Sequence, residues 1–311
     1  MENAFKIIIS GLQNAGKTSI LTALDKKYDF VKEVLELKPT IKVEYRKTKF
    51  LGSPTVFWDM GGQEKYRQLY LSKPEMYFDS SDLLIYVIDI QDSEKYNESL
   101  NYLHSVLEYF IDNDIYLPLI ITFHKYDPNL RSYDEINENI YMLRDQIKES
   151  YPMFNILFQQ TSIYDIISII QLMSYGLSIF DGKFFELSLY METSLNEFNC
   201  YSLILFDAQS VIISEYYNED IEPNLYEAFL DSIKEHIYLI KRIEENEEEI
   251  KDNQNFFTME NELISYLYTL NVHNEKFFVS VILEEDKKDK FLEQYSDFIK
   301  KLEDILLSLV G

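Results

Sequence analysis

The first half of the chain alternates short apolar runs with amphipathic stretches. Several runs are too continuously apolar to leave one strand face in water, which is typical of a parallel sheet covered by helices on both sides. These strand-like runs lie at 5–10, 55–60, 82–89, 117–123 and 154–159. Between two of them, apolar residues recur at helical spacing from Leu100 to Phe110. The pattern predicts an α/β domain with a doubly wound, mostly parallel sheet at residues 1–175.

The pattern changes after about Ser174. Apolar residues recur every three or four positions in three stretches, which predicts amphipathic helices at 184–198, 225–240 and 291–309. Strand-like runs fill the remainder, at 201–209, 210–217, 253–260, 264–272 and 276–284. The first two of these runs are adjacent in the chain and are expected to form a hairpin. The order α-β-β-α-β-β-β-α predicts a second, α+β domain with an antiparallel sheet at residues 178–311.

The charge balance restricts the partners. The chain has 54 acidic and 29 basic residues, a formal net charge of −25. Nucleic-acid binding needs a basic face that neutralises phosphates, so we expect no nucleic-acid partner. Anionic membranes are disfavoured for the same reason, and no window approaches the roughly 18 apolar residues of a membrane span. We expect membrane association only through partner proteins.

Cysteine usage points to a reducing compartment. Cys200 is the single cysteine, so no intramolecular disulfide can form and a cytoplasmic location is expected. In that setting, its side chain is expected to be buried as a small apolar residue.

A phosphate-binding motif follows the first predicted strand. The stretch GLQNAGKT fits G-x-x-x-x-G-K-[ST] and lies between that strand and a predicted helix, the context in which backbone N–H groups cradle phosphates. Lys17 is expected to reach the β- and γ-phosphates, and the Thr18 hydroxyl to ligate Mg²⁺. The predicted nucleotide contacts are Gly11, Gln13, Asn14, Ala15, Gly16, Lys17, Thr18 and Ser19.

The stretch TFHKYD, directly after a predicted strand, distinguishes between bases. Asp127 can accept from guanine N1–H and the N2 amino group together, a pair of donors that adenine lacks. Lys125 is expected to lay its alkyl stem along the base. His124 stands where GTPases usually have Asn, and the alternative for it is a surface or loop histidine without ligand contact. After the last strand of the domain, the backbone N–H of Ser162 is expected to meet guanine O6, with Ile163 contacting the nucleotide beside it.

Two further segments concern cleavage of the phosphate. In FWDMGGQ, Asp59 is expected to hold Mg²⁺ through water, the Gly62 N–H to reach the γ-phosphate, and Gln63 to orient the attacking water. In KPTIKVEY, Thr40 offers a hydroxyl that completes the Mg²⁺ shell when the γ-phosphate is present. Alternatives remain, since Asp59 could cap a turn and Thr40 could be an ordinary strand-edge threonine.

In their order along the chain, these motifs resemble the Ras-superfamily GTPases, and WDMGGQ is similar to the Arf and Rag branches. The wide gap from Thr18 to Thr40, the run TIKVEYRKTKFLG, the histidine of HKYD and TSIYD are most similar to Rag/Gtr GTPases. In the second half, SLILFDAQSVIISEYY followed by a long helix resembles their roadblock-like, longin-related domain. The resemblance implies GTP or GDP and Mg²⁺ as cofactors, with activating and exchange proteins as partners. It also implies dimerisation with a related chain through the C-terminal domain, as a homodimer or heterodimer, and recruitment to membranes by partners.

Three functions are consistent with these motifs. The first is a GTP switch that hydrolyses slowly by itself, because no arginine is evident in the sequence to assist in cis. The second is a non-hydrolysing, nucleotide-bound scaffold subunit, against which Gln63 and the intact GKT argue. The third is an ATP-using enzyme with a regulatory domain, which Asp127 argues against.

Overall fold

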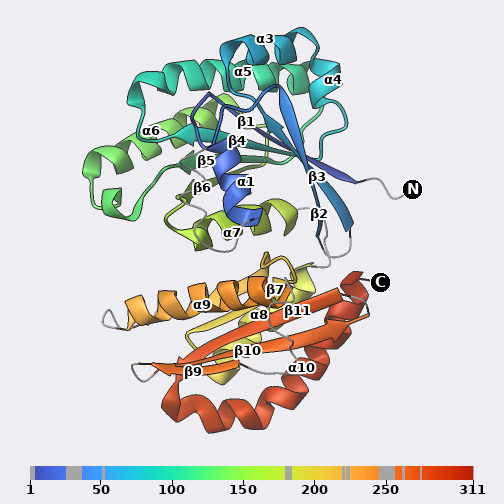
Figure 1. Cartoon of the computed structure of the whole chain (residues 1–311), viewed down its shortest axis with the longest axis vertical. Coiled ribbons are helices and arrows are strands. Elements are labelled where there is room, and N and C mark those ends of the chain that lie inside the picture. Colours follow the sequence, from blue (N-terminus) through green and yellow to red (C-terminus); the bar gives the residue numbers. More distant parts are fainter. Residues whose placement is uncertain are drawn as a thin grey trace. The chain divides into compact units, whose positions relative to one another are not determined.

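The computed structural model of the chain describes residues 4–25, 37–50, 53–178, 184–218, 221, 225–244, 256–260, 263–273 and 275–310. The chain divides into two compact units, Met1–Leu172 and Met173–Gly311, which Figure 1 shows in blue to green and in yellow to red. Each unit has its own sheet. None of the helices within the described ranges is long and apolar enough to cross a membrane.

The first unit contains a six-stranded sheet in the order β2-β3-β1-β4-β5-β6. Its strands are β1 (Phe5–Gly11), β2 (Val43–Phe50), β3 (Ser53–Met60), β4 (Leu83–Asp89), β5 (Leu119–His124) and β6 (Ile156–Thr161). All neighbours are parallel except β2, which runs antiparallel to β3. Every residue of β5 is buried. This agrees with the continuous apolar runs, which predicted a sheet covered on both faces.

Strand β2 was not among the predicted strands. It forms the edge of the sheet, and four of the eight residues in its sequence VEYRKTKF are charged. Such a strand has too few apolar residues for a hydrophobic pattern to reveal it. Its strand conformation comes from antiparallel pairing with β3, in which Val43 lies opposite Met60.

Helices cover the sheet of the first unit on both faces. They are α1 (Lys17–Asp25), α3 (Glu64–Ser72), α4 (Pro74–Phe78), α5 (Tyr96–Asp112), α6 (Asp134–Ser150) and α7 (Ile166–Ser178), with short 3-10 turns at Ser93–Lys95 and Pro128–Leu130. Helices α3, α4, α5 and α6 share one hydrophobic core with the sheet. This core includes Leu103 and Phe110 of α5 and Leu143 of α6. Helix α1 lies on the opposite face (Figure 1). The predicted doubly wound, mostly parallel fold of the first domain is confirmed.

The second unit contains a five-stranded antiparallel sheet in the order β8-β7-β11-β10-β9. Its strands are β7 (Ser202–Asp207), β8 (Ile212–Tyr217), β9 (Phe256–Glu260), β10 (Leu263–Val272) and β11 (Glu275–Glu284). Its helices are α8 (Phe184–Phe198), α9 (Tyr226–Glu244) and α10 (Lys288–Val310), with a 3-10 turn at Glu285–Lys287. The predicted hairpin of β7 and β8 is present.

Two neighbouring residues of β11 show how the second unit is layered. Ser280 accepts or donates a 2.7 Å hydrogen bond with Nδ1 of His236, which belongs to α9. Val279 points to the opposite face, where its cross-strand partner Tyr268 stacks on Tyr295 of α10 at 4.1 Å between ring centroids. Helix α9 therefore covers one face and α10 the other, an arrangement that fits a roadblock-like domain.

The single cysteine is buried in the second unit, as the sequence predicted. Burial raises the pKa of the Cys200 thiol to about 12. Its side chain therefore stays a neutral thiol at cellular pH.

Candidate functional site

A tight loop connects β1 to α1. It is closed by hydrogen bonds from Ala15 N to Leu12 O (3.3 Å) and from Ile20 N to Gly16 O (3.0 Å). The loop needs a residue without a side chain at Gly16, which has φ +97°, and an added β-carbon there would lie 2.2 Å from Cδ2 of His124. The backbone conformation and the close approach of the ring both select glycine at this position.

Lys17, the first residue of α1, is folded back onto this loop. Its Nζ donates to Gly11 O at 3.0 Å and to Leu12 O at 2.6 Å. The side chain is buried, and burial lowers the pKa of the ammonium to about 8, while the nearby Asp59 opposes that shift. A bound phosphate would offer this ammonium a charged acceptor in place of two neutral carbonyls.

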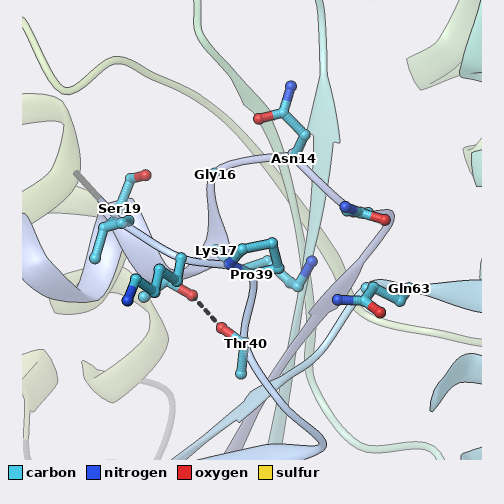
Figure 2. Close-up of a pocket in the computed structure, with 12 residues that line it drawn as sticks. Asn14, Gly16, Lys17, Ser19, Pro39, Thr40 and Gln63 are labelled. Atoms are coloured by element: carbon cyan, nitrogen blue, oxygen red, sulfur yellow. Dashed lines mark hydrogen bonds between the residues drawn. The ribbon is translucent and has the colours of Figure 1, made fainter. Parts of the chain in front are cut away.

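Three oxygen-bearing side chains meet beside the loop, although they come from separate parts of the chain. Thr18 donates to Oδ2 of Asp59 at 2.6 Å, and its hydroxyl also lies 2.7 Å from that of Thr40 (Figure 2). The other carboxylate oxygen, Oδ1 of Asp59, is buried and has no hydrogen-bond partner among the described residues. Burial raises the pKa of Asp59, against the hydrogen bond from Thr18, which lowers it.

This oxygen set is suited to a hard divalent cation. Mg²⁺ prefers one or two carboxylates together with hydroxyl, water and phosphate oxygens, and a buried carboxylate oxygen without a partner is costly unless something neutralises it. The residues present at this point therefore fit Mg²⁺, and the predicted ligands Thr18, Thr40 and Asp59 would hold it.

The turn after β3 packs directly against the phosphate loop. A β-carbon at Gly62 would lie 2.4 Å from the backbone N of Gln13, so only glycine allows this approach. Gln63 follows as the N-cap residue of α3. One turn further, Arg67 donates from Nε to Gly62 O at 3.1 Å and pairs with Glu98 of α5. Arg67 was not among the predicted site residues, because its partner Glu98 lies 31 positions away in the chain.

The phosphate loop, residues 37–40 and the turn after β3 together form a pocket of about 170 Å³. It is lined by Gln13, Asn14 and Gly16 of the loop, by Lys17, Thr18 and Ser19 at the start of α1, by Leu37, Lys38, Pro39 and Thr40, and by Gly62 and Gln63. Figure 2 shows Ser19 and Gln63 on opposite sides of it, with Thr40 between them. Of the predicted phosphate-loop contacts, Gly11 and Ala15 are buried in the loop and do not line the pocket.

The residues predicted to read the base form a second cluster at the ends of β4, β5 and β6. Asp127 accepts from Ser162 Oγ at Oδ1 (2.6 Å) and from Gln91 Nε2 at Oδ2 (2.9 Å). Lys125, with φ +63°, donates from Nζ to Asp89 at 2.6 Å. Gln91 was not predicted, and no motif in the chain would have identified it. These residues lie outside the pocket, and Ile163 is half-buried beside Ser162.

His124 links the two clusters. It is 1% exposed, its Nδ1 lies 2.9 Å from the hydroxyl of Thr161, and its ring lies against Gly16. Burial lowers the pKa of the imidazole to about 3, so the ring is neutral. The alternative of a surface or loop position for His124 is therefore wrong, and contact of its ring with a ligand stays a prediction.

One expected contact at this cluster has a competing hydrogen bond. The N–H of Ser162 donates to Ser168 Oγ at 3.1 Å in a buried position, so this N–H already has an acceptor, and its contact with guanine O6 stays a prediction. The hydroxyl of Ser162 also contributes to the cluster, through its bond to Asp127. The adjacent Ile163 is a second predicted residue whose N–H could meet O6.

The chain is similar in sequence to several known proteins. A family model described as the Gtr1/RagA G protein conserved region matches residues 6–233. ADP-ribosylation factor-like protein 5 of Caenorhabditis elegans is 36% identical over 106 residues, 34% of this chain and 54% of that protein. Ras-related GTP-binding protein A of Dictyostelium discoideum is 32% identical over 124 residues, 39% of this chain and 40% of that protein.

A solved structure is also similar. The Arl6 BBS3 small GTPase from Trypanosoma brucei, with the nucleotide analogue GppNp bound, has a TM-score of 0.44 and 17% identity, covering 57% of this chain and 97% of that chain. The matched regions span about half or less of the length of the two curated relatives.

Proposed function

The chain belongs to the Gtr1/RagA family of G proteins, and from this we propose that it is a switch that binds GTP or GDP with Mg²⁺ and hydrolyses GTP slowly. The observation that carries the proposal is the meeting of Thr18, Thr40 and Asp59 beside the phosphate loop. Thr40 belongs to a different segment of the chain from the phosphate loop. The position of its hydroxyl would therefore depend on which nucleotide is bound. Loss of the γ-phosphate would release the segment around Thr40.

Phosphate binding is assigned to the loop and to Lys17. The loop N–H groups and the N-terminus of α1 would face the phosphates, and Lys17 would exchange its carbonyl partners for phosphate oxygens. A bound Mg²⁺ would neutralise charge on the β- and γ-phosphates while held by Thr18, Thr40 and Asp59. The Gly62 N–H would donate to the γ-phosphate, since Gly62 already lies against Gln13.

Hydrolysis is assigned to Gln63, which lines the pocket and would orient the attacking water. Arg67 lies one helical turn after Gln63, but its guanidinium already forms hydrogen bonds with Glu98 and with Gly62 O. That pairing supports a slow intrinsic rate, roughly 10⁻⁴ to 10⁻³ s⁻¹ as in unassisted switches. We propose that an activating protein supplies the missing positive charge, and that an exchange protein reloads GTP.

Guanine selection is assigned to Asp127, with Lys125 along the base and the N–H of Ile163 toward O6. Support comes from Ser162, whose hydroxyl holds Oδ1 of Asp127 at 2.6 Å. A carboxylate fixed in this way rejects adenine, which has no pair of donors at the corresponding edge.

The second unit is proposed to dimerise. Its sheet ends in two edge strands, β8 and β9, and its outer helices α8 and α10 are long and amphipathic. Such edges and helix faces favour a two-fold or pseudo-two-fold dimer with a second copy or a related GTPase. Sedimentation of the full chain, alone and mixed with a related GTPase, tests this: a monomer in every mixture at tens of micromolar contradicts it.

Two measurements test the switch. The nucleotide released on denaturing the purified protein should be GDP or GTP by chromatography, and GTP loaded in Mg²⁺ should yield phosphate in a single turnover. Adenine nucleotide would contradict the base assignment. GTP bound without any phosphate release above buffer would favour the alternative of a non-hydrolysing scaffold subunit.

A further inference from the structure

Gln91, in the loop after β4, has a side chain that bridges two parts of the base cluster. Its Nε2 donates to the backbone O of Lys125 at 2.7 Å and to Oδ2 of Asp127 at 2.9 Å. The two hydrogens of one amide thus connect the loop after β4 to Lys125 and Asp127 in the loop after β5.

The loop that carries Gln91 is itself fixed. The backbone N of Gln91 donates to Oδ1 of Asp89 at 3.0 Å, and Oδ2 of the same carboxylate accepts from Lys125 Nζ at 2.6 Å. Asp89 is also paired with His124 in the register of β4 and β5. Gln91 therefore contacts Asp127 from a rigid support, although its own side chain is exposed.

The hydrogen bonds at Asp127 divide evenly between its two oxygens. A carboxylate has about four acceptor positions, two on each oxygen. Ser162 occupies one on Oδ1 and Gln91 occupies one on Oδ2, at 2.6 and 2.9 Å. One position remains on each oxygen, which is the number that a two-donor base edge requires.

We propose that Gln91 is a specificity-determining positioning residue: with Ser162, it holds both oxygens of Asp127 toward the N1–H and N2 amino donors of guanine. The proposal rests on guanine-nucleotide binding as the function. A base with only the N1–H donor, hypoxanthine, needs a single oxygen of Asp127. It is therefore predicted to depend much less on Gln91 than guanine does.

The test compares GDP with inosine diphosphate, which lacks the 2-amino group, by titration calorimetry on the full chain in Mg²⁺. Gln91→Met keeps the length of the side chain and removes its donors. Its GDP affinity should fall about 3- to 10-fold, the usual cost of one lost hydrogen bond, while inosine diphosphate should weaken by less than about twofold. Gln146→Met, at an exposed glutamine of α6, is the matched control and should change neither affinity.

The ratio of the GDP affinity to the inosine diphosphate affinity distinguishes a positioning role of Gln91 from a merely structural one. An equal loss for both nucleotides, or no loss, overturns the role of Gln91 while leaving guanine binding intact. A parental protein that binds neither GDP nor GTP overturns the proposed function and this inference together. Should Gln91→Met unfold early in a thermal scan, Gln91→Glu provides the same ratio, since its carboxylate would repel Asp127 and lower GDP affinity more.

Discussion

The imidazole of His124 lies so close to Gly16 that a β-carbon added to the glycine would come within 2.2 Å of Cδ2 of the ring. Gly16→Ala should therefore destabilise the first unit by about 1 to 3 kcal/mol and weaken GDP binding, because φ +97° adds strain to the clash. The double variant Gly16→Ala/His124→Ala should lose less than the sum of the two single variants, since removal of the ring relieves the clash. Chemical unfolding of all four proteins measures the coupling, and additivity within about 0.3 kcal/mol would show that the ring does not press on the loop.

Asp127→Asn should exchange base preference. The amide presents a donor where guanine also presents donors, so GTP affinity should fall roughly 100-fold, while xanthosine triphosphate, with a carbonyl at that edge, should bind. Competition against a fluorescent GDP analogue measures both. Asp134→Asn, at the first turn of α6, serves as the control with the same chemistry. Unchanged GTP affinity in Asp127→Asn would remove Asp127 from the base site.

Gln63→Leu should separate binding from hydrolysis. The phosphate contacts belong to the loop and to Lys17, so GTP affinity should stay within about twofold, while the single-turnover rate should fall 10-fold or more because the water loses its orienting amide. Gln68→Leu, on the same helix but hydrogen-bonded to Glu64, is the control. A Gln63→Leu protein that hydrolyses at the parental rate assigns water orientation to another residue.

The Arg67–Glu98 pair predicts coupling between α3 and α5. Arg67→Ala should slow hydrolysis and lower GTP affinity relative to GDP, because Arg67 also holds Gly62 O at 3.1 Å and would orient the glycine toward a γ-phosphate. The charge reversal Arg67→Glu/Glu98→Arg should restore part of the loss of Arg67→Glu alone. Single-turnover rates of the four proteins decide this, and a reversal no better than Arg67→Glu alone argues against the pair.

Acid should weaken the second unit through His236. The folded pKa is about 3 and the ordinary value is 6.5, so between these values only the unfolded chain binds the proton. Stability is thus complete above pH ~6.5 and falls toward pH 3, by up to about 1.4 kcal/mol per pH unit for this one group. His236→Asn should flatten the slope of unfolding free energy against pH between about 5.5 and 4. Equal slopes in the parental protein and in His236→Asn would contradict the assignment.

Local signals in the sequence determined much of the fold. The buried strands and several amphipathic helices can be recognised from hydrophobic periodicity within a dozen residues. The predicted runs supplied every strand of the two sheets except β2. The edge strand β2 could not be recognised in this way, because a strand with one partner needs little apolar surface. The identities of the phosphate-loop and base-loop residues were likewise readable, since backbone phosphate cradles require glycines at fixed spacing.

Contacts between distant segments were decided only by the tertiary structure. The sequence alone determined that Lys17, Thr18 and Asp127 are present in their motifs, since each motif is a short continuous stretch. It could not determine that the Ser162 N–H is taken by Ser168, that Gln91 holds Asp127, or that Arg67 pairs with Glu98. A hydrogen bond depends on positions to within a few tenths of an ångström, and those positions follow from how the strands and helices of the first unit pack rather than from any local pattern.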